Sequence, residues 1–205
     1  MRRAAGMFTH ACRCGATQLD VAVPGPGAGT YVVCYCTDCQ TAARLHKGGA
    51  DILTPAGGTH VWQTAPAHIT RIAGADHLEI LRLTPRGAFR WHARCCGTPM
   101  INTLPSLGMP FSGIVLRQSE LPDIVPLLGP VTCHYSTLGA RPGAGAPAQD
   151  SGVPRAILQV GWRILRGLVP GNTRRNPLRR ADGSPAAPIR VVPPEARLAA
   201  AREIG

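Results

Sequence analysis

Aromatic residues make up only 4% of this sequence, so its core must be built largely from Leu, Ile, Val and Ala. Lysine is scarcer still, because Lys47 is the single lysine among 22 basic residues. No run of about 18 apolar residues occurs, which excludes a membrane-spanning helix. The first residues, MRRAAGMFTHACRCG, also lack the apolar run of a secretory signal peptide. We therefore expect a cytoplasmic protein with no membrane partner.

Acidic residues are few as well, and the 11 Asp and Glu leave a formal net charge of +11. The excess is greatest in residues 141–205, where 11 Arg face 4 acidic residues. An acidic small molecule, an acidic protein and nucleic acid are the partners that such a charge attracts. Trp162 is the one aromatic residue in this tail, and no nucleic-acid reading motif accompanies it, which argues against nucleic acid.

Glycine and proline are abundant, with 24 and 20 residues, and they predict many turns and short elements. Runs rich in β-branched and apolar residues lie between these turn signals and predict strands. The predicted strands cover residues 16–23, 30–34, 59–63, 69–73, 77–83, 87–92 and 112–117. Many short strands at this spacing favour a mainly β fold, as an antiparallel sheet or a small barrel, with a few short helices.

A short helix is expected inside the second cysteine group, because Thr37 and Gln40 have capping-box spacing and Gly48-Gly49 would end it. Residues 139–153 are low in complexity and resemble a flexible linker. They would separate a zinc-binding domain, residues 1–138, from a basic extension, residues 154–205, with one or two helices.

The first helix of that extension is predicted in PRAILQVGWRILRGLV. An apolar stripe recurs at helical spacing: Ile157, Val160, Gly161, Ile164, Leu165 and Leu168. We expect the stripe to dock on the domain, the alternative being contact with a membrane or a partner.

Eight cysteines fall into three groups and one single residue. The groups are Cys12 and Cys14; Cys34, Cys36 and Cys39; and Cys95 and Cys96. In extended backbone, residues i and i+2 point to the same side, and a C-x-x-C turn also brings two sulfurs together. In a reducing compartment, such pre-organised sets indicate zinc sites more than disulfides.

Cys12 and Cys14 need partners from far along the chain, and Cys95 and Cys96 are the other available pair. These four predict a structural zinc site. Neighbouring side chains converge only where the backbone turns sharply, so His10 or His92 is an alternative fourth ligand. Cys34, Cys36 and Cys39 would then hold a second zinc with one coordination position open for chemistry. Alternatively, Cys133 or His134 closes that site; we expect Cys133 to be a buried apolar residue.

Three motifs in one order carry a family resemblance: Cys12-x-Cys14-Gly15, Cys34-x-Cys36-x-x-Cys39-Gln40 and Cys96-Gly97-Thr98-Pro99. Over about residues 8–117 they resemble the glutathione-dependent formaldehyde-activating enzyme family, also called the centromere protein V family. The stretches CYCTDCQ and FRWHARCCGTPMINT, with the Arg-rich tail, look closest to an uncharacterised bacterial branch of that superfamily. Tyr35 stands where the family enzymes commonly carry histidine.

The resemblance implies the Mss-four-like fold, a twisted antiparallel β-sheet assembly stabilised by one structural zinc. It also implies a catalytic zinc on Cys34, Cys36 and Cys39, and a carbon–sulfur lyase activity that joins formaldehyde to glutathione. Arg44, Lys47 and Arg94 are candidates to bind the carboxylates of such a thiol. The alternative function is a non-enzymatic zinc module whose basic tail binds a partner.

Overall fold

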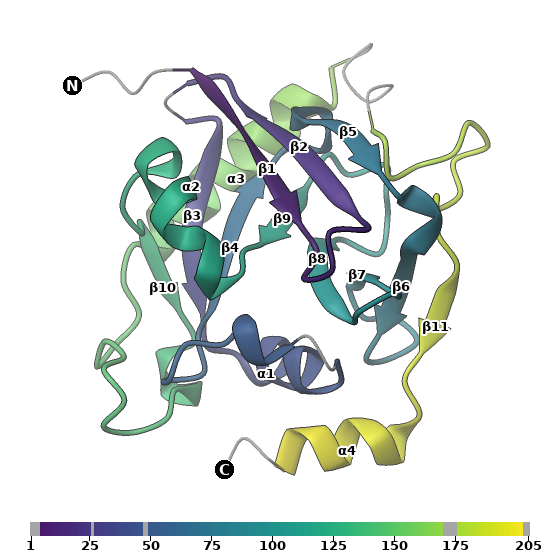
Figure 1. Ribbon diagram of the computed structural model, residues 1–205. Helices are drawn as coiled ribbons and strands as arrows, with labels where there is room; N and C mark the ends of the chain where they lie inside the picture. Colours follow the sequence, from purple (N-terminus) through teal and green to yellow (C-terminus); the bar gives the residue numbers. More distant parts are fainter. Residues whose placement is uncertain (1–4, 26, 47–48, 170–175, 203–205) are drawn as a thin grey trace.

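Eleven strands form two sheets in the computed structural model, which describes residues 5–25, 27–46, 49–169 and 176–202 (Figure 1). The smaller sheet is antiparallel, with the order β1 (Gly6–Ala11), β2 (Gln18–Val23) and β5 (Ile69–Ala73). The larger sheet has the order β10-β3-β4-β9-β8-β7-β6-β11. Its strands are β3 (Gly29–Cys34), β4 (Thr59–Thr64), β6 (Leu78–Arg82), β7 (Phe89–Ala93), β8 (Thr98–Thr103), β9 (Ser112–Val115), β10 (Cys133–Tyr135) and β11 (Ile189–Val191).

The six inner strands of the large sheet pair antiparallel, as expected from the sequence. Its two edge strands do not: β10 pairs parallel with β3, and β11 pairs parallel with β6. Both edge strands reach the sheet through long connections, which parallel pairing requires. The fold is thus mainly β with short helices, as predicted, but its strands form two sheets where a single sheet or a small barrel was expected.

The main core contains apolar residues from both sheets. Leu19 and Val21 of the small sheet belong to one buried cluster with Ile80, Trp91 and Ile101 of the large sheet. Leu178, far along the chain in the predicted extension, is fully buried in the same cluster. The C-terminal region therefore adds side chains to the core as well as strand β11 to the sheet edge.

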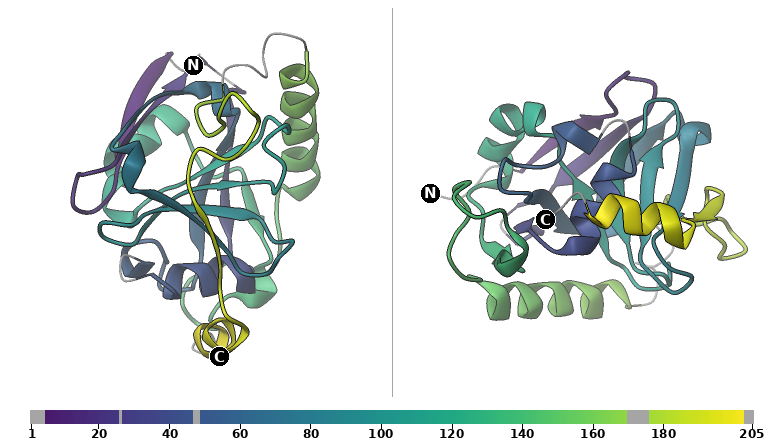
Figure 2. Two further views of the ribbon diagram at one scale, coloured as in Figure 1. Left: turned by 90° about the vertical axis from the view of Figure 1, so that its right-hand side faces the viewer. Right: turned by 90° about the horizontal axis from the view of Figure 1, so that it is seen from below.

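Four helices lie around the sheets: α1 (Thr37–Arg44), α2 (Leu121–Leu128), α3 (Val153–Gly167) and α4 (Pro194–Arg202). α2 packs near β1 and buries Ile124 and Leu128 in the main core. α4 lies beside α1, where Val192 and Ala42 share a smaller apolar cluster (Figures 1 and 2). Among the described residues, no helix combines the length and the hydrophobicity needed to cross a membrane.

α3 has the predicted position but not the predicted orientation. It lies along the outside of the molecule (Figure 2), with only Ala156 fully buried. Ile157, Leu165 and Leu168 of the predicted docking stripe are exposed. Val160 and Ile164 of the same stripe are half-buried, on the side of the helix where Ala156 is buried. The stripe therefore docks along one edge only, and polar contacts from Gln159 and Arg163 to β3 also hold that side inward.

Candidate metal centres

The first cluster brings together the sulfurs of four cysteines, which the sequence predicted as one metal site. Cys12 and Cys14 lie in the turn between β1 and β2, and Cys95 and Cys96 in the turn between β7 and β8. The Sγ atoms of Cys12 and Cys14 are 3.5 Å apart, and that of Cys95 lies 3.8 and 3.3 Å from them. Cys96 Sγ lies 3.9 Å from Cys95 Sγ.

These separations fit one tetrahedral ion. Four sulfurs at about 2.3 Å from a zinc ion lie about 3.8 Å from one another. Neither candidate histidine replaces a cysteine, since His10 contacts Glu120 and His92 contacts Glu79. The four-cysteine cluster can therefore hold a metal ion with protein ligands alone.

Tight turns explain how adjacent cysteines both reach the cluster. Gly15 and Gly97 follow the two cysteine pairs with φ of +77° and +70°, a region that favours glycine. In the second turn, the amides of Cys96 and Gly97 both donate to the carbonyl of Ala93. This sharp reversal is the condition under which neighbouring side chains converge.

Hydrogen bonds around the cluster favour thiolate sulfur. The amide of Thr17 donates to Cys12 Sγ at 3.3 Å, and the Thr98 hydroxyl lies 3.1 Å from Cys96 Sγ. Burial opposes ionisation of Cys96, but bonds from Thr98 and the backbone of Cys14 outweigh it and lower the pKa of this thiol to about 6. Burial raises the pKa of Cys95 to about 12 in the metal-free chain. A cation would remove that penalty by binding the thiolate.

The second cluster joins Cys34, Cys36 and Cys39 where β3 ends and α1 begins. Cys36 is the N-cap of α1, and its sulfur accepts from the amide of Cys39 at 3.4 Å. The predicted cap, Thr37, is therefore one residue too late, and Cys39 lies in the first helical turn. In the described part of the chain, no other Cys, His, Asp or Glu ligand atom joins these three within 4.8 Å.

Arg90 of β7 supplies positive charge to the three-cysteine cluster. Its Nη1 lies 3.9 Å from Cys39 Sγ, and its Nη2 lies 3.7 Å from Asp38. Bonds from Cys34 and Cys36, followed by the attraction of Arg90, hold the pKa of Cys39 well below its ordinary value. Bonding to Cys36 and Cys39 raises the pKa of Cys34. In the metal-free cluster, negative charge thus concentrates on Cys39.

Open space adjoins the three-cysteine cluster on two sides. An open cleft of about 580 Å³, the Cys36 cleft, is lined by Cys36, Tyr135, Thr137 and Leu138, among others. A small pocket of about 20 Å³, the Cys39 pocket, is lined by Cys39, His46, Arg90 and Trp91, among others. The larger space can take a substrate of the size of a small peptide, and the smaller one a group about the size of a water molecule.

Two histidines lie at the Cys39 pocket: His46 lines it and is half-buried, and His92 is buried beside His46. The rings of His46 and His92 are 4.2 Å apart, and His92 Nε2 lies 3.1 Å from a carboxylate oxygen of Glu79. Burial, followed by the charges of His92, Arg190 and Arg90, lowers the pKa of His46 to about 3. His46 is therefore neutral at pH 7, and Arg90 is the cation of this pocket.

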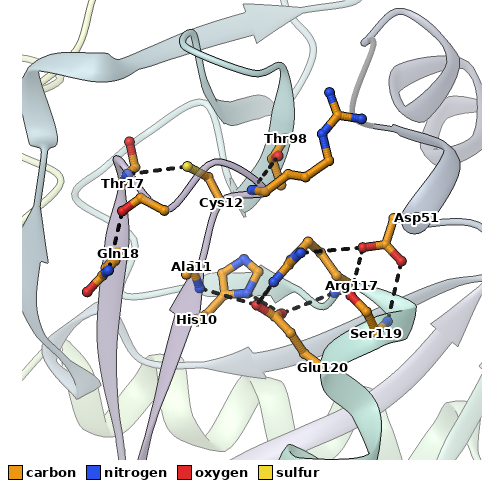
Figure 3. A network of polar contacts seen from close by, with 12 residues as sticks. His10, Ala11, Cys12, Thr17, Gln18, Asp51, Thr98, Arg117, Ser119 and Glu120 are labelled. Carbon is orange, nitrogen blue, oxygen red and sulfur yellow. Dashed lines mark hydrogen bonds and ion pairs between the residues drawn. The ribbon is translucent and has the colours of Figure 1, made fainter.

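A second polar network supports the four-cysteine cluster from the β1 side (Figure 3). His10 Nδ1 lies 2.7 Å from Glu120, and Arg117 donates to the same carboxylate at 2.8 and 3.1 Å. Arg117 also lies 3.5 Å from Asp51, which accepts from the Ser119 hydroxyl. The network joins β1, which leads into Cys12, to the start of α2.

Comparison with protein-family models gives one match, to a family of unknown function (DUF6151), over residues 5–190. The chain belongs to the DUF6151 family. No curated protein matches it. The DUF6151 match contains all eight cysteines and runs through α3 to the first residues of β11.

Within the described chain, the other predicted site residues of this DUF6151 protein are not part of the three-cysteine cluster. Cys133 is buried with Val32 and Ala156 and belongs to neither cluster, as expected. Arg94 directly precedes Cys95 and so lies at the four-cysteine cluster, not at the three-cysteine cluster. Arg44 bonds to Gln40, and Lys47 lies outside the described residues.

Sequence reasoning missed Arg90 and His46 in the DUF6151 protein. Arg90 sits in the predicted strand FRWH, but its place opposite Cys39 depends on the pairing of strands far apart in sequence. His46 is close to Cys39 along the chain, and the turn after α1 brings it into the same pocket. The sequence did hold one signal for His46, because this histidine lies seven positions after Cys39, the last cysteine of the motif.

Proposed function

We propose that this protein binds two zinc ions, one structural and one at an open site that carries out thiol–aldehyde chemistry of the carbon–sulfur lyase type. Cys12, Cys14, Cys95 and Cys96 would hold the first ion, and Cys34, Cys36 and Cys39 the second. One observation carries the proposal: three thiols converge beside a cleft, and no fourth protein ligand joins them among the described residues.

The reaction class follows from the cysteine set and from the family resemblance. A zinc ion with one open position supplies Lewis-acid chemistry and keeps a bound sulfur as a thiolate at neutral pH. In the proposed reaction, the sulfur of a small thiol such as glutathione adds to the carbonyl carbon of formaldehyde. A carbon–sulfur bond forms, and the thiol proton ends on the new hydroxyl group, so no oxidant or reductant is needed. An Mss-four-like fold is part of this proposal.

The chain's own residues would bind and orient the reactants. The Cys36 cleft is large enough for the thiol, and its open face admits a peptide-like body. Arg90 places a guanidinium at the Cys39 pocket, where oxygen gains negative charge as the carbonyl is attacked. His46 is neutral there and offers a hydrogen bond without competing charge.

Cys36→Ser is the sharpest test, because serine can still cap α1 while it removes a metal-binding thiolate. We expect the zinc content to fall by about one ion per chain, and the exchange of ¹³C-formaldehyde with glutathione, followed by NMR, to return to the uncatalysed rate. Cys133→Ser is the matched control, since Cys133 is buried and belongs to neither cluster; it should keep both zinc and exchange.

Two results would decide against the enzyme. The first is zinc-loaded wild-type protein that exchanges the adduct no faster than buffer, with both ions resistant to a chelator. That outcome would favour the non-enzymatic zinc module with a basic tail. The second is a chain that folds normally without any bound metal, which would contradict both the zinc enzyme and the non-enzymatic zinc module.

A further inference from the structure

The outer face of α3 is an exposed apolar surface. Six large apolar side chains of this helix and its end are between 46% and 74% exposed: Ile157, Leu158, Trp162, Leu165, Leu168 and Val169. At 3.6 residues per turn they fall on one side of the helix. They make up half of the twelve large apolar residues that are exposed in the described chain. We call this set the α3 outer face.

Polar contacts hold the other side of α3 inward. The Thr30 hydroxyl of β3 donates to Gln159 at 3.0 Å and accepts from Arg163 at 2.6 Å. An amphipathic surface helix normally turns its apolar stripe to the core. Val153 and Ala156 pack on the same inner side with Val32 and Cys133. These contacts and the bonds of Gln159 and Arg163 fix the rotation of the helix, so the α3 outer face is kept in solvent. Exposed apolar patches that are held in place in this way mark interaction surfaces.

Charge identifies the kind of partner. Arg155 and Arg166 follow one edge of the α3 outer face by their helical spacing, and the Arg166 guanidinium lies 5.5 Å from the Trp162 ring centroid. The whole chain carries +11. Two copies of so basic a protein repel each other, whereas a negatively charged surface attracts both the arginines and the chain as a whole.

We propose that the α3 outer face binds an anionic phospholipid surface. The helix would lie in the plane of the interface, with its apolar side chains among the acyl chains and its arginines at the headgroups. A Trp beside an Arg suits that boundary, since each has an apolar body and a polar tip. α3 is too short to span a bilayer, so the protein would be held at the surface only. This replaces the sequence-based expectation of no membrane partner.

Tryptophan fluorescence tests the proposal directly. Trp62 and Trp91 are buried, so Trp162 is the one tryptophan of the three that vesicles can reach. Vesicles of phosphatidylcholine with phosphatidylglycerol should shift the emission to shorter wavelength and protect it from an aqueous quencher. Phosphatidylcholine alone should do so far less, and added salt should weaken the effect.

A pair of variants isolates the helix face. Leu158→Ser with Leu165→Ser keeps the tryptophan and should lower vesicle affinity about tenfold or more, because two buried leucines are lost from the interface. Leu198→Ser is the matched control, a half-exposed leucine on α4. It should bind vesicles as the wild type does.

Three outcomes would overturn the proposal. The first is a wild type that does not bind anionic vesicles, and the second is binding that is equally strong with both leucines replaced. The third is a dimer, seen by sedimentation, that the two substitutions abolish, because the occupant would then be a second copy. None of these measurements uses zinc or exchange activity, so their failure leaves the proposed function untouched.

Discussion

Glu120 is the carboxylate on which the polar contacts around β1 converge. Burial opposes its charge, but hydrogen bonds and attraction from His10 and Arg117 prevail and lower its pKa to about 2. The folded protein therefore holds the ionised form more strongly than the unfolded chain does. The contribution to stability is complete above the ordinary pKa of 4.5 and is lost as the pH falls toward about 2.

At neutral pH, Glu120→Gln should lower the free energy of unfolding by about 2–3 kcal/mol, since it removes the negative charge and one of the two acceptor oxygens that His10 and Arg117 share. As the pH falls from about 4.5 to about 2, the free energy of unfolding of the wild type should fall toward that of the variant. Urea unfolding at several pH values measures both effects. Asp76→Asn, at an exposed carboxylate, is the control; an equal loss in that variant would contradict the assignment.

At the scale of elements, seven strands were predicted from the sequence, and all seven are present with ends shifted by a few residues. Four strands were missed, because they lack the signals that identify the other seven. β1 (GMFTHA) contains no Val or Ile. β10 and β11 are three residues long, and β8 begins in the turn after the adjacent cysteines and contains Pro99. α2 contains Pro122 and Pro126 within eight residues, so its helical pattern is hidden. These elements exist because tertiary packing, not local preference, selects them.

Two glycines should respond in opposite ways to alanine. A Cβ at Gly29 in β3 would lie 2.3 Å from the indole of Trp62, which is buried and cannot move away. Gly29→Ala should therefore lower the free energy of unfolding by about 1–3 kcal/mol. Gly161 in α3 has open space around its Cβ position, so Gly161→Ala should raise stability by about 0.5–1 kcal/mol. Denaturant unfolding compares the two, and a loss at both positions would be contrary to the packing described.

At the scale of the whole molecule, the four-cysteine cluster links the two sheets. Cys12 and Cys14 come from the β1–β2 turn of the small sheet, and Cys95 and Cys96 from the β7–β8 turn of the large one. Residue spacing predicted the membership of this cluster, because each pair is pre-organised locally. The surroundings of the three-cysteine cluster, above all Arg90, depend on strand register and could not be predicted from residue spacing.

Metal removal should therefore affect the two clusters unequally. Cys14→Ser should lower the free energy of unfolding by several kcal/mol, because an ion held by this cluster would join segments far apart in the chain. Cys36→Ser should lower the free energy of unfolding by less, since the three-cysteine cluster spans only the end of β3 and the start of α1. Thermal unfolding with and without a chelator measures the difference. A larger loss of stability in Cys36→Ser would mean that the three-cysteine cluster is the main structural one.

The parallel pairing of β11 with β6 has a practical consequence for expressing shorter versions of the protein. A chain ended at residue 138 would leave one edge of β6, opposite β7, without a paired strand and would empty the place of Leu178 in the interior. An unprotected strand edge recruits other chains, and a vacated interior position weakens the shape that would resist them. Such a shortened product should be recovered mainly as insoluble aggregate, whereas one ended after residue 192 should stay in solution.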